Sequence, residues 1–191
     1  MRMADPVLTV AVLAAGSGRR FGGGKLDALL AGKPVGAWVL DAVRAAGLPS
    51  GIIITGPVAP SFAHASGWAI TENPHPDRGL GSSLALAART ARGRLLVLLA
   101  DMPLVSGAYL ARLCTSGGAA ATLYPDAKCG VPAIFPQTLL PQLGNLTGDA
   151  GAGSILKGLP DLTLFDPPEQ MLLDIDRPAD LHRVEAILRG G

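Results

Sequence analysis

The fold of this chain is constrained most strongly by two runs of almost uninterrupted apolar residues, Val7–Ala14 and Leu95–Ala100. A strand with one face in water alternates apolar and polar residues, whereas a parallel strand covered by helices on both faces is apolar throughout. Both runs are far shorter than the stretch of about 20 apolar residues that crosses a bilayer. They therefore predict two central strands of a buried parallel sheet.

The first run also has the length of a signal-peptide core, and Arg2 lies before it. Asp5 and Pro6 interrupt the basic region, however, and the run leads directly into a loop rich in glycine and arginine. A buried first strand is therefore the better interpretation of this segment.

The rest of the chain alternates between short apolar runs and longer amphipathic stretches. Further strands are expected at Gly51–Thr55, Ala120–Tyr124 and Val131–Phe135. Helices are expected at Val35–Ala46, Ser82–Ala91, Ala108–Cys114 and Arg177–Arg189, and surface loops at Glu72–Gly81 and Asp166–Glu169. Strands that alternate with helices predict βαβ units, and so an α/β fold with a mainly parallel sheet in a single domain over residues 1–191. Functional residues in such sheets belong on loops at the carboxyl ends of the strands.

Charge and cysteine content exclude several function classes. The 16 Lys and Arg residues nearly balance the 15 Asp and Glu residues, and the formal net charge is +1. A nucleic acid or an anionic membrane needs a basic surface that displaces counterions, so neither is an expected partner. Cys114 and Cys129 lack CxxC spacing, which argues against zinc and a disulfide framework. We therefore expect a reduced, soluble, cytoplasmic domain.

The strongest local signal is a glycine-rich loop directly after the first strand, Leu13-Ala-Ala-Gly-Ser-Gly-Arg-Arg-Phe-Gly-Gly-Gly-Lys25. Its glycines let the backbone fold tightly around an anion, and Arg20 and Lys25 add positive charge that suits a triphosphate. The loop fits neither a Walker A motif, since Leu26 follows the lysine, nor a dinucleotide fingerprint, since Phe21 replaces the third glycine. A flexible turn with incidental basic residues is the alternative.

Carboxylates form the second signal. Asp101 follows the strand at Leu95–Ala100, where a carboxylate near a phosphate loop can hold Mg²⁺ together with phosphates and water. Period-two spacing around Ile175 predicts a short strand with Asp174 and Asp176 on one face, where a cation would offset their repulsion. The alternatives are that Asp101 caps a turn and that Asp176 caps the last helix.

Two weaker segments could bind a ligand. The glycine–serine turn in Asn73–Leu84 has backbone N–H groups and hydroxyls that suit a base edge or a phosphate, although Ser82 or Ser83 could instead be an N-cap. Gly130–Phe135 and Gly148–Ser154 are candidates for an acceptor side. The three histidines, His64, His75 and His182, are far apart in sequence and are expected on the surface or in loops.

Taken in order, these segments resemble the molybdenum cofactor cytidylyltransferase family, within the wider MobA-like nucleotidyltransferases. The family pattern LAAGxSxRxGxxK matches Leu13–Lys25, with Gly18 in place of the usual Ser. The patterns NP…GMGSSL, DMP, GxP, GDxGA and DIDxPxDL match Asn73–Leu84, Asp101–Pro103, Gly130–Pro132, Gly148–Ala152 and Asp174–Leu181. The resemblance therefore spans almost the whole chain.

The resemblance implies a three-layer, Rossmann-like nucleotidyltransferase fold with a mostly parallel central sheet. It also implies attack by a phosphate-bearing acceptor on the α-phosphorus of a nucleoside triphosphate, with release of pyrophosphate. Ala15 favours CTP, because guanylyl-transferring relatives typically read LAGG where this chain reads LAAG. The favoured acceptor is molybdopterin, and the product could pass to a molybdoenzyme or its chaperone.

The same resemblance implies catalytic, metal-binding, nucleotide-binding and acceptor-binding roles for individual residues. Arg20, Lys25 and Asp101 would be catalytic, and Asp101 and Asp176 would ligate Mg²⁺. Nucleotide binding would involve Leu13, Ala14, Ala15, Gly16, Ser17, Gly18, Arg20, Lys25, Gly81, Ser82, Ser83 and Asp101, and acceptor binding Gly130, Pro132 and Asp149.

Two positions depart from the family pattern. Asp27 stands where relatives usually carry Leu, and Gly153 replaces an Arg that is common after GDxGA and would contact an anionic acceptor. Gly153 keeps open the same chemistry on a sugar or polyol phosphate, and Asp27 a non-catalytic nucleotide-binding or chaperone protein. A further alternative is an NADPH-binding reductase that uses the glycine-rich loop for the pyrophosphate and the 2′-phosphate.

Overall fold

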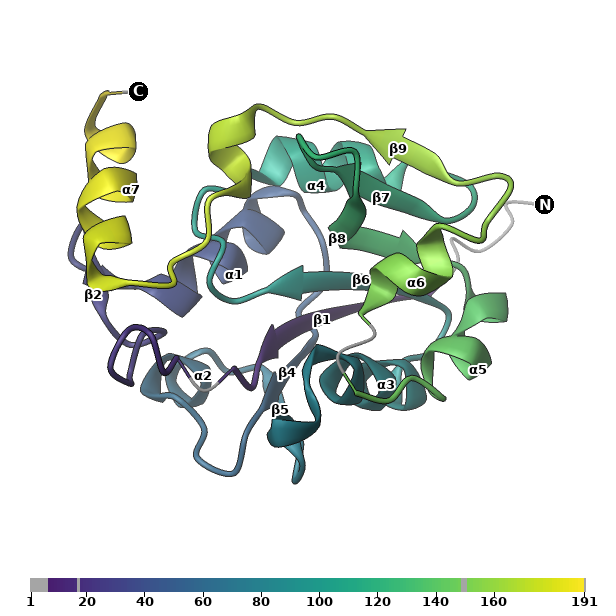
Figure 1. Cartoon of the computed structure of the whole chain (residues 1–191), viewed down its shortest axis with the longest axis horizontal. Coiled ribbons are helices and arrows are strands. Elements are labelled where there is room, and N and C mark those ends of the chain that lie inside the picture. The colour runs from purple at the N-terminus through teal and green to yellow at the C-terminus, as the bar shows by residue number, and fades with distance from the viewer. Residues whose placement is uncertain (1–6, 17, 149–150, 191) are drawn as a thin grey trace.

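The computed structural model describes residues 7–16, 18–148 and 151–190. Within these ranges, seven strands form one sheet (Figure 1). From one edge to the other, they are β5 (Ala69–Glu72), β4 (Ile52–Thr55), β1 (Leu8–Ala14), β6 (Arg94–Leu99), β8 (Cys129–Phe135), β7 (Ala120–Leu123) and β9 (Thr163–Phe165). β5, β4, β1 and β6 are parallel, β8 runs antiparallel to both of its neighbours, and β9 is parallel to β7. The prediction of a mostly parallel α/β sheet is confirmed.

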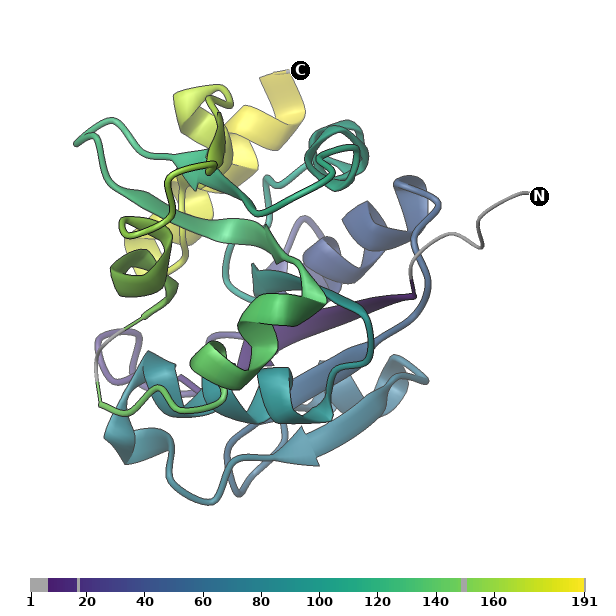
Figure 2. The same cartoon turned by 90° about the vertical axis from the view of Figure 1, so that its right-hand side faces the viewer.

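Helices cover both faces of the sheet (Figures 1 and 2). One face carries α1 (Val35–Ala45), α2 (Ser61–Ala65), α4 (Gly107–Cys114) and α7 (Pro178–Gly190). The other carries α3 (Leu80–Thr90), α5 (Leu140–Leu143) and α6 (Ala152–Leu156). Smaller elements are the antiparallel hairpin of β2 (Leu29–Leu30) and β3 (Lys33–Pro34) and the 3₁₀ turns η1 (Pro76–Arg78), η2 (Gln137–Leu139) and η3 (Glu169–Leu172).

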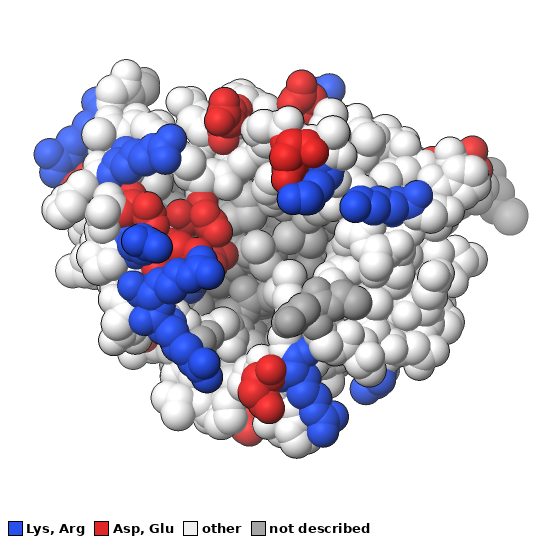
Figure 3. Space-filling model, in the orientation of Figure 1, with Lys and Arg blue, Asp and Glu red and all other residues white. Residues whose placement is uncertain are grey.

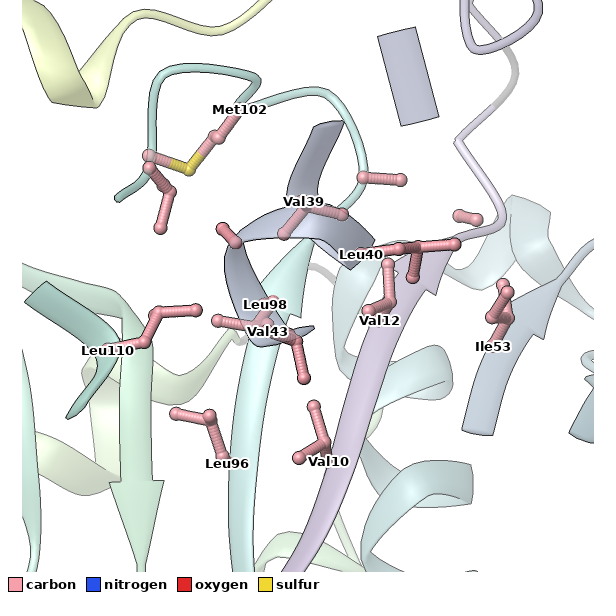
Figure 4. Close-up of a cluster of buried hydrophobic side chains, with 14 of the residues drawn as sticks. Val10, Val12, Val39, Leu40, Val43, Ile53, Leu96, Leu98, Met102 and Leu110 are labelled. Carbon is pink, nitrogen blue, oxygen red and sulfur yellow. The ribbon is translucent and has the colours of Figure 1, made fainter. Parts of the chain in front are cut away.

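The core explains why the two central strands are apolar apart from Thr9 and Arg94 near their starts. Val10 and Val12 of β1 face the helices α1 and α4, while Ala11 and Leu13 face α3 and α5 on the other side. Figure 4 shows the first of these clusters, where side chains of β1 and β6 meet those of α1 and Leu110 of α4. Because successive strand residues point to opposite faces, a strand between two helical layers buries nearly all of its side chains and is therefore mostly apolar.

The predicted strand around Asp174 and Asp176 is wrong. Residues 173–177 form an irregular segment between η3 and α7, and Pro178 begins the helix at once. The alternation itself holds, since Ile175 is buried in the core and its N–H donates to the carbonyl oxygen of Asp101 at 2.9 Å. A segment tied to its neighbour by this bond can alternate its side chains without joining the sheet.

Other elements also differ from the predictions. α3 begins at Leu80, before Ser82 and Ser83, so neither serine is its N-cap. The predicted loop Glu72–Gly81 contains the end of β5, η1 and the start of α3. The elements that the sequence patterns missed are all short: β2, β3, β5, β9, α2, α5 and α6. In the part of the chain that the structure describes, no helix has the length and apolar character needed to span a membrane.

Candidate active site

The glycine-rich loop leaves the carboxyl end of β1 and folds back on itself. Four of its glycines have positive φ angles: Gly18 at 56°, Gly22 at 93°, Gly23 at 96° and Gly24 at 65°. The N–H groups of Phe21 and Gly23 both donate to the carbonyl oxygen of Gly18, at 3.0 and 3.2 Å. Residues with a Cβ rarely adopt such φ angles, so the run of glycines permits a compact loop that ends at Lys25.

Lys25 brings together carboxylates from two distant segments. Lys25 is only 8% exposed, and its Nζ lies 2.6 Å from Oδ2 of Asp101 and 3.4 Å from Oδ1 of Asp176. Nη1 of Arg20 lies 3.1 Å from the other oxygen of Asp176. The structure thus places in one cluster the predicted catalytic and metal-binding residues Arg20, Lys25, Asp101 and Asp176. Figure 3 shows basic and acidic side chains gathered beside a hollow in this face.

Backbone contacts hold the two aspartates in place. Asp101 lies two residues after the end of β6, and its carbonyl oxygen accepts the N–H of Ile175. Asp180, in the first turn of α7, accepts the N–H groups of Asp176 and Arg177 at 2.9 and 2.6 Å through Oδ2. Asp180 therefore caps this helix and orients Asp176. The sequence analysis missed this role, although an acidic residue two positions after the first helical residue is a typical signal for it.

The cluster alters the acid–base properties of its members. Burial alone would lower the pKa of Lys25, but the charges and hydrogen bonds of Asp101 and Asp176 outweigh it and raise that pKa above 10.5. The pKa of Asp174 is raised, first because neighbouring groups reduce its hydration and then because Asp101 and Asp176 are negative. Lys25 is therefore a permanent cation here, and the acidic side of the cluster favours a further positive charge.

Tyr124, beyond the end of β7, is a site neighbour that the sequence analysis missed. Its hydroxyl donates to the carbonyl oxygen of Val131 at 2.6 Å. Its ring packs against Gly130, where an added Cβ would lie 3.1 Å from a ring carbon. Burial, followed by the negative charges of Asp174 and others, raises the pKa of Tyr124 to about 12. The phenol is thus a neutral donor that holds the start of β8.

The predicted acceptor residues are only partly described. Gly130 and Pro132 both lie on β8, and the Val131–Pro132 peptide bond is cis. The carbonyl oxygen of Pro132 accepts a hydrogen bond from the buried Thr122 hydroxyl at 2.7 Å. Asp149 and the predicted nucleotide-binding residue Ser17 lie outside the described residues.

A cavity of about 850 Å³ opens beside the glycine-rich loop. One side is formed by the loop and its continuation, and the other by the segment after β4 together with the turn before α3. Its described lining residues are Ala14, Ala15, Gly16, Gly18, Arg19, Gly24, Lys25, Leu26, Asp27, Gly56, Pro57, Val58, Ala59, Pro60, Ser61, Pro76, Asp77 and Gly79. Five predicted nucleotide-binding residues are among them, whereas Leu13 is buried in the core. The wall at residues 56–61 carries no motif, and the sequence analysis missed it.

The glycine–serine turn is engaged by the protein itself. Nδ2 of Asn73, a buried residue, lies 2.9 Å from the Oγ atoms of both Ser82 and Ser83. The Ser82 hydroxyl donates to the carbonyl oxygen of Gly79 at 2.8 Å, and the N–H of Gly81 donates to the carbonyl oxygen of Gly148 at 3.2 Å. The described lining of the cavity includes Gly79 but none of Gly81, Ser82 and Ser83. In this structure the two serines shape the turn that presents Gly79.

The two departures from the family pattern have structural counterparts. Asp27 accepts hydrogen bonds from the first two N–H groups of α2. Gly153 lies in α6 against β8, where a Cβ would be 3.2 Å from the carbonyl oxygen of Cys129. A side chain at position 153 would therefore require the helix or the strand to shift.

The three-layer α/β fold, with a glycine-rich loop at the end of its first strand and paired carboxylates facing its lysine, is that of a nucleotidyltransferase. The chain belongs to the MobA-like NTP transferase domain family, whose profile matches residues 10–163. This assignment confirms the resemblance to the MobA-like nucleotidyltransferases, and it favours a nucleotidyltransferase over an NADPH-binding reductase.

Individual relatives agree with this assignment. A molybdenum cofactor guanylyltransferase of Cereibacter sphaeroides is 30% identical over 193 residues, which cover 93% of this chain and 95% of the relative. The crystal structure of Rv0371c from Mycobacterium tuberculosis H37Rv is 27% identical, with a TM-score of 0.80 over 96% of this chain and all of that one. Its complex with manganese is 26% identical, with a TM-score of 0.71 over 94% and 98% of the two chains.

Proposed function

We propose that this protein transfers a nucleoside monophosphate from a nucleoside triphosphate to the molybdenum cofactor, with Mg²⁺ as the metal and CTP as the preferred nucleotide. The observation that carries the proposal is the cluster at Lys25. One buried ammonium group faces carboxylates from two separate segments, beside a cavity at the carboxyl end of the sheet's first strand. Oxygen ligands and a cation at one point match the needs of a metal-bound triphosphate.

The donor set of the cluster fits Mg²⁺. Asp101 and Asp176 each have a carboxylate oxygen within 3.4 Å of the same Lys25 nitrogen, so both already face one positive charge. Mg²⁺ binds to one or two carboxylates and completes its coordination with water and phosphate oxygens. Among the described residues, no group of three or more His, Cys, Asp or Glu side chains is placed to hold a metal alone, so the substrate would supply further ligands. The manganese complex of Rv0371c supports a divalent cation in this family.

In the reaction, an oxygen of the acceptor phosphate forms a bond to the α-phosphorus. The bond from the α-phosphorus to the bridging oxygen breaks, and its electron pair leaves with pyrophosphate. Bound Mg²⁺ would neutralise phosphate charge. Arg20 and Lys25 would stabilise the charge that develops on the α-phosphate and the departing pyrophosphate, so that catalysis rests on positioning and electrostatics.

Lys25 has a second function in this proposal. Without nucleotide it neutralises Asp101 and Asp176, which would otherwise repel each other. With metal-bound nucleotide, its ammonium group is available for phosphate oxygens. The same lysine would therefore keep the carboxylates together before binding and hold the triphosphate afterwards.

The choice of nucleotide rests on Ala15, which lines the cavity. A methyl group at this position narrows the cavity where relatives that transfer guanylyl groups typically have glycine, and this supports the smaller base of CTP. GTP is the second candidate, because the 30% identical relative is a guanylyltransferase. The identity of that relative also supports the molybdenum cofactor as acceptor over a sugar or polyol phosphate.

The test is to incubate the protein with Mg²⁺, molybdenum cofactor and either CTP or GTP, and to follow pyrophosphate release and dinucleotide formation. Lys25→Ala should lower the rate by about 10²–10³, the usual effect of removing one charge-stabilising donor. Lys33→Ala is the matched control, since Lys33 pairs with Asp41 outside the described cavity lining. If pyrophosphate is released with GTP but not with CTP, the proposed nucleotide preference is reversed. No release with either nucleotide, or equal rates for Lys25→Ala and Lys33→Ala, would reject the proposal.

A further inference from the structure

Asp27 makes a contact that joins the two sides of the cavity. Its Oδ2 and Oδ1 accept the N–H groups of Ser61 and Phe62, at 2.7 and 2.8 Å. These are the first two residues of α2, whose own N-cap, Pro60, provides no side-chain acceptor. The first N–H groups of a helix need acceptors, and a carboxylate is a strong one. A residue more than 30 positions earlier in the chain thus caps this helix.

The neighbours of Asp27 do the same for α1. The carbonyl oxygens of Leu26 and Ala28 accept the N–H groups of Gly36 and Val35, at 2.9 and 3.0 Å. Three successive residues, Leu26–Ala28, therefore cap two helices at once. These residues come directly after Lys25, so the end of the glycine-rich loop is fixed to both helices.

Packing between α1 and α2 reinforces this junction. Phe62 is buried, and its ring lies so near Gly36 that a Cβ there would be 2.4 Å from a ring carbon. The glycine leaves room for the ring, and the buried ring anchors α2 against α1. Asp27 then fixes the N-terminal end of α2, which carries the preceding segment Pro57–Pro60 into the cavity wall.

The two sides of the cavity differ in chemistry. The loop side carries Arg19, Lys25 and Asp27. On the opposite side, the segment Pro57–Pro60 contains only proline, valine and alanine, and the turn before α3 adds Asp77. Val58, which lines the cavity, is 89% exposed, so its side chain is open to contact with a ligand. Phosphates suit the first side, and the faces of a base and the carbons of a ribose suit the second.

We infer that Asp27 is a positioning residue for the nucleoside part of the substrate: it holds Pro57–Pro60 at a set distance from the phosphate-binding Lys25. This inference rests on the proposed function only in taking a nucleoside triphosphate as the ligand. The two N–H donors also explain how a carboxylate is tolerated beside a phosphate site, since they partly neutralise it. The departure from the family pattern at position 27 is thus a structural link rather than a defect.

The experiment measures dissociation constants for CTP, GTP and inorganic tripolyphosphate, each with Mg²⁺, by calorimetry. Asp27→Leu removes both acceptors at similar size, and Asp27→Asn keeps one acceptor oxygen. Asp27→Leu should weaken the better-bound nucleotide about tenfold, as expected when a lost cap displaces one wall, but should not weaken tripolyphosphate, because the variant removes a negative charge beside the phosphates. Asp27→Asn should give a smaller loss. Ser106→Ala is the matched control, because it removes the cap of α4, whose N-cap Ser106 is not among the described residues that line the cavity.

Each outcome decides the inference. Unchanged nucleotide affinity in Asp27→Leu would overturn it and leave the proposed function intact. Equal weakening of nucleotide and tripolyphosphate would also overturn it, since Asp27 would then act on the phosphate loop. If Asp27→Leu does not fold, Asp27→Asn carries the same comparison. Absence of triphosphate binding by the unmodified protein would overturn both proposals, whereas binding without transfer to the molybdenum cofactor would reject only the proposed function.

Discussion

The pairing of Lys25 with Asp101 should be the strongest ion pair of the site, and a double-mutant cycle can measure it. The cycle compares the unmodified protein with Lys25→Met, Asp101→Asn and the double variant. Lys25→Met keeps most of the buried aliphatic chain and removes the ammonium group. The coupling free energy is the part of the loss in stability that disappears when both partners are changed.

The structure provides the expected magnitude. The Lys25–Asp101 pair has an N–O distance of 2.6 Å, and its side chains are only 9% and 19% exposed. A hydrogen bond between charged groups contributes about 1.5–3 kcal/mol when water is largely excluded, so we expect a coupling of about 2 kcal/mol. The Arg20–Asp176 pair is longer, at 3.1 Å, and its side chains are 73% and 40% exposed. Its coupling should be below about 1 kcal/mol, as for other solvated pairs.

The assay is urea unfolding followed by circular dichroism, with Arg20→Gln and Asp176→Asn forming the second cycle. Both cycles are measured at the same pH and salt concentration, because screening affects the exposed pair more. A Lys25–Asp101 coupling that is equal to or smaller than the Arg20–Asp176 coupling would refute the reasoning. It would mean that the cost of burying the lysine cancels the attraction of the carboxylates.

Two further predictions concern the pKa of Lys25 and the side-chain amide of Asn73. Because the pKa of Lys25 in the folded protein is above its ordinary value of 10.5, its contribution to stability is fully present below pH 10.5 and is lost as the pH rises through the folded value. As the pH rises from neutral, the difference in urea stability between the unmodified protein and Lys25→Met should therefore shrink only above pH 10.5, and a difference that shrinks between neutral pH and pH 10.5 would contradict the raised pKa. Asn73→Ala should lower the free energy of unfolding by about 1–3 kcal/mol, because the amide that bridges the Ser82 and Ser83 hydroxyls is lost from a buried position. Urea unfolding measures this loss, and a loss below about 0.5 kcal/mol, typical of surface changes, would show that the bridge is not needed.

The sequence by itself determined the central strands and the main chemical residues. β1 and β6 were predictable because a strand covered on both faces is apolar at nearly every position, and few other structures of this length require that pattern. The glycine-rich loop was predictable because positive φ angles strongly favour glycine, Lys25 because it ends that loop, and Asp101 because it comes just after β6. These signals are local, so they can be read from neighbouring residues alone.

The tertiary structure decided what no local pattern encodes. β5 and β9 are short edge strands, which exist because a neighbouring strand offers hydrogen bonds rather than because of their own residues. The segment around Ile175 alternates like a strand but remains irregular, since a single bond to Asp101 and the start of α7 fix its course. The contacts of Asp176 with Lys25, and of Asp27 with α2, join residues far apart in sequence. Such contacts depend on how whole elements pack, so only the folded chain establishes which carboxylate faces the lysine and which one caps a helix.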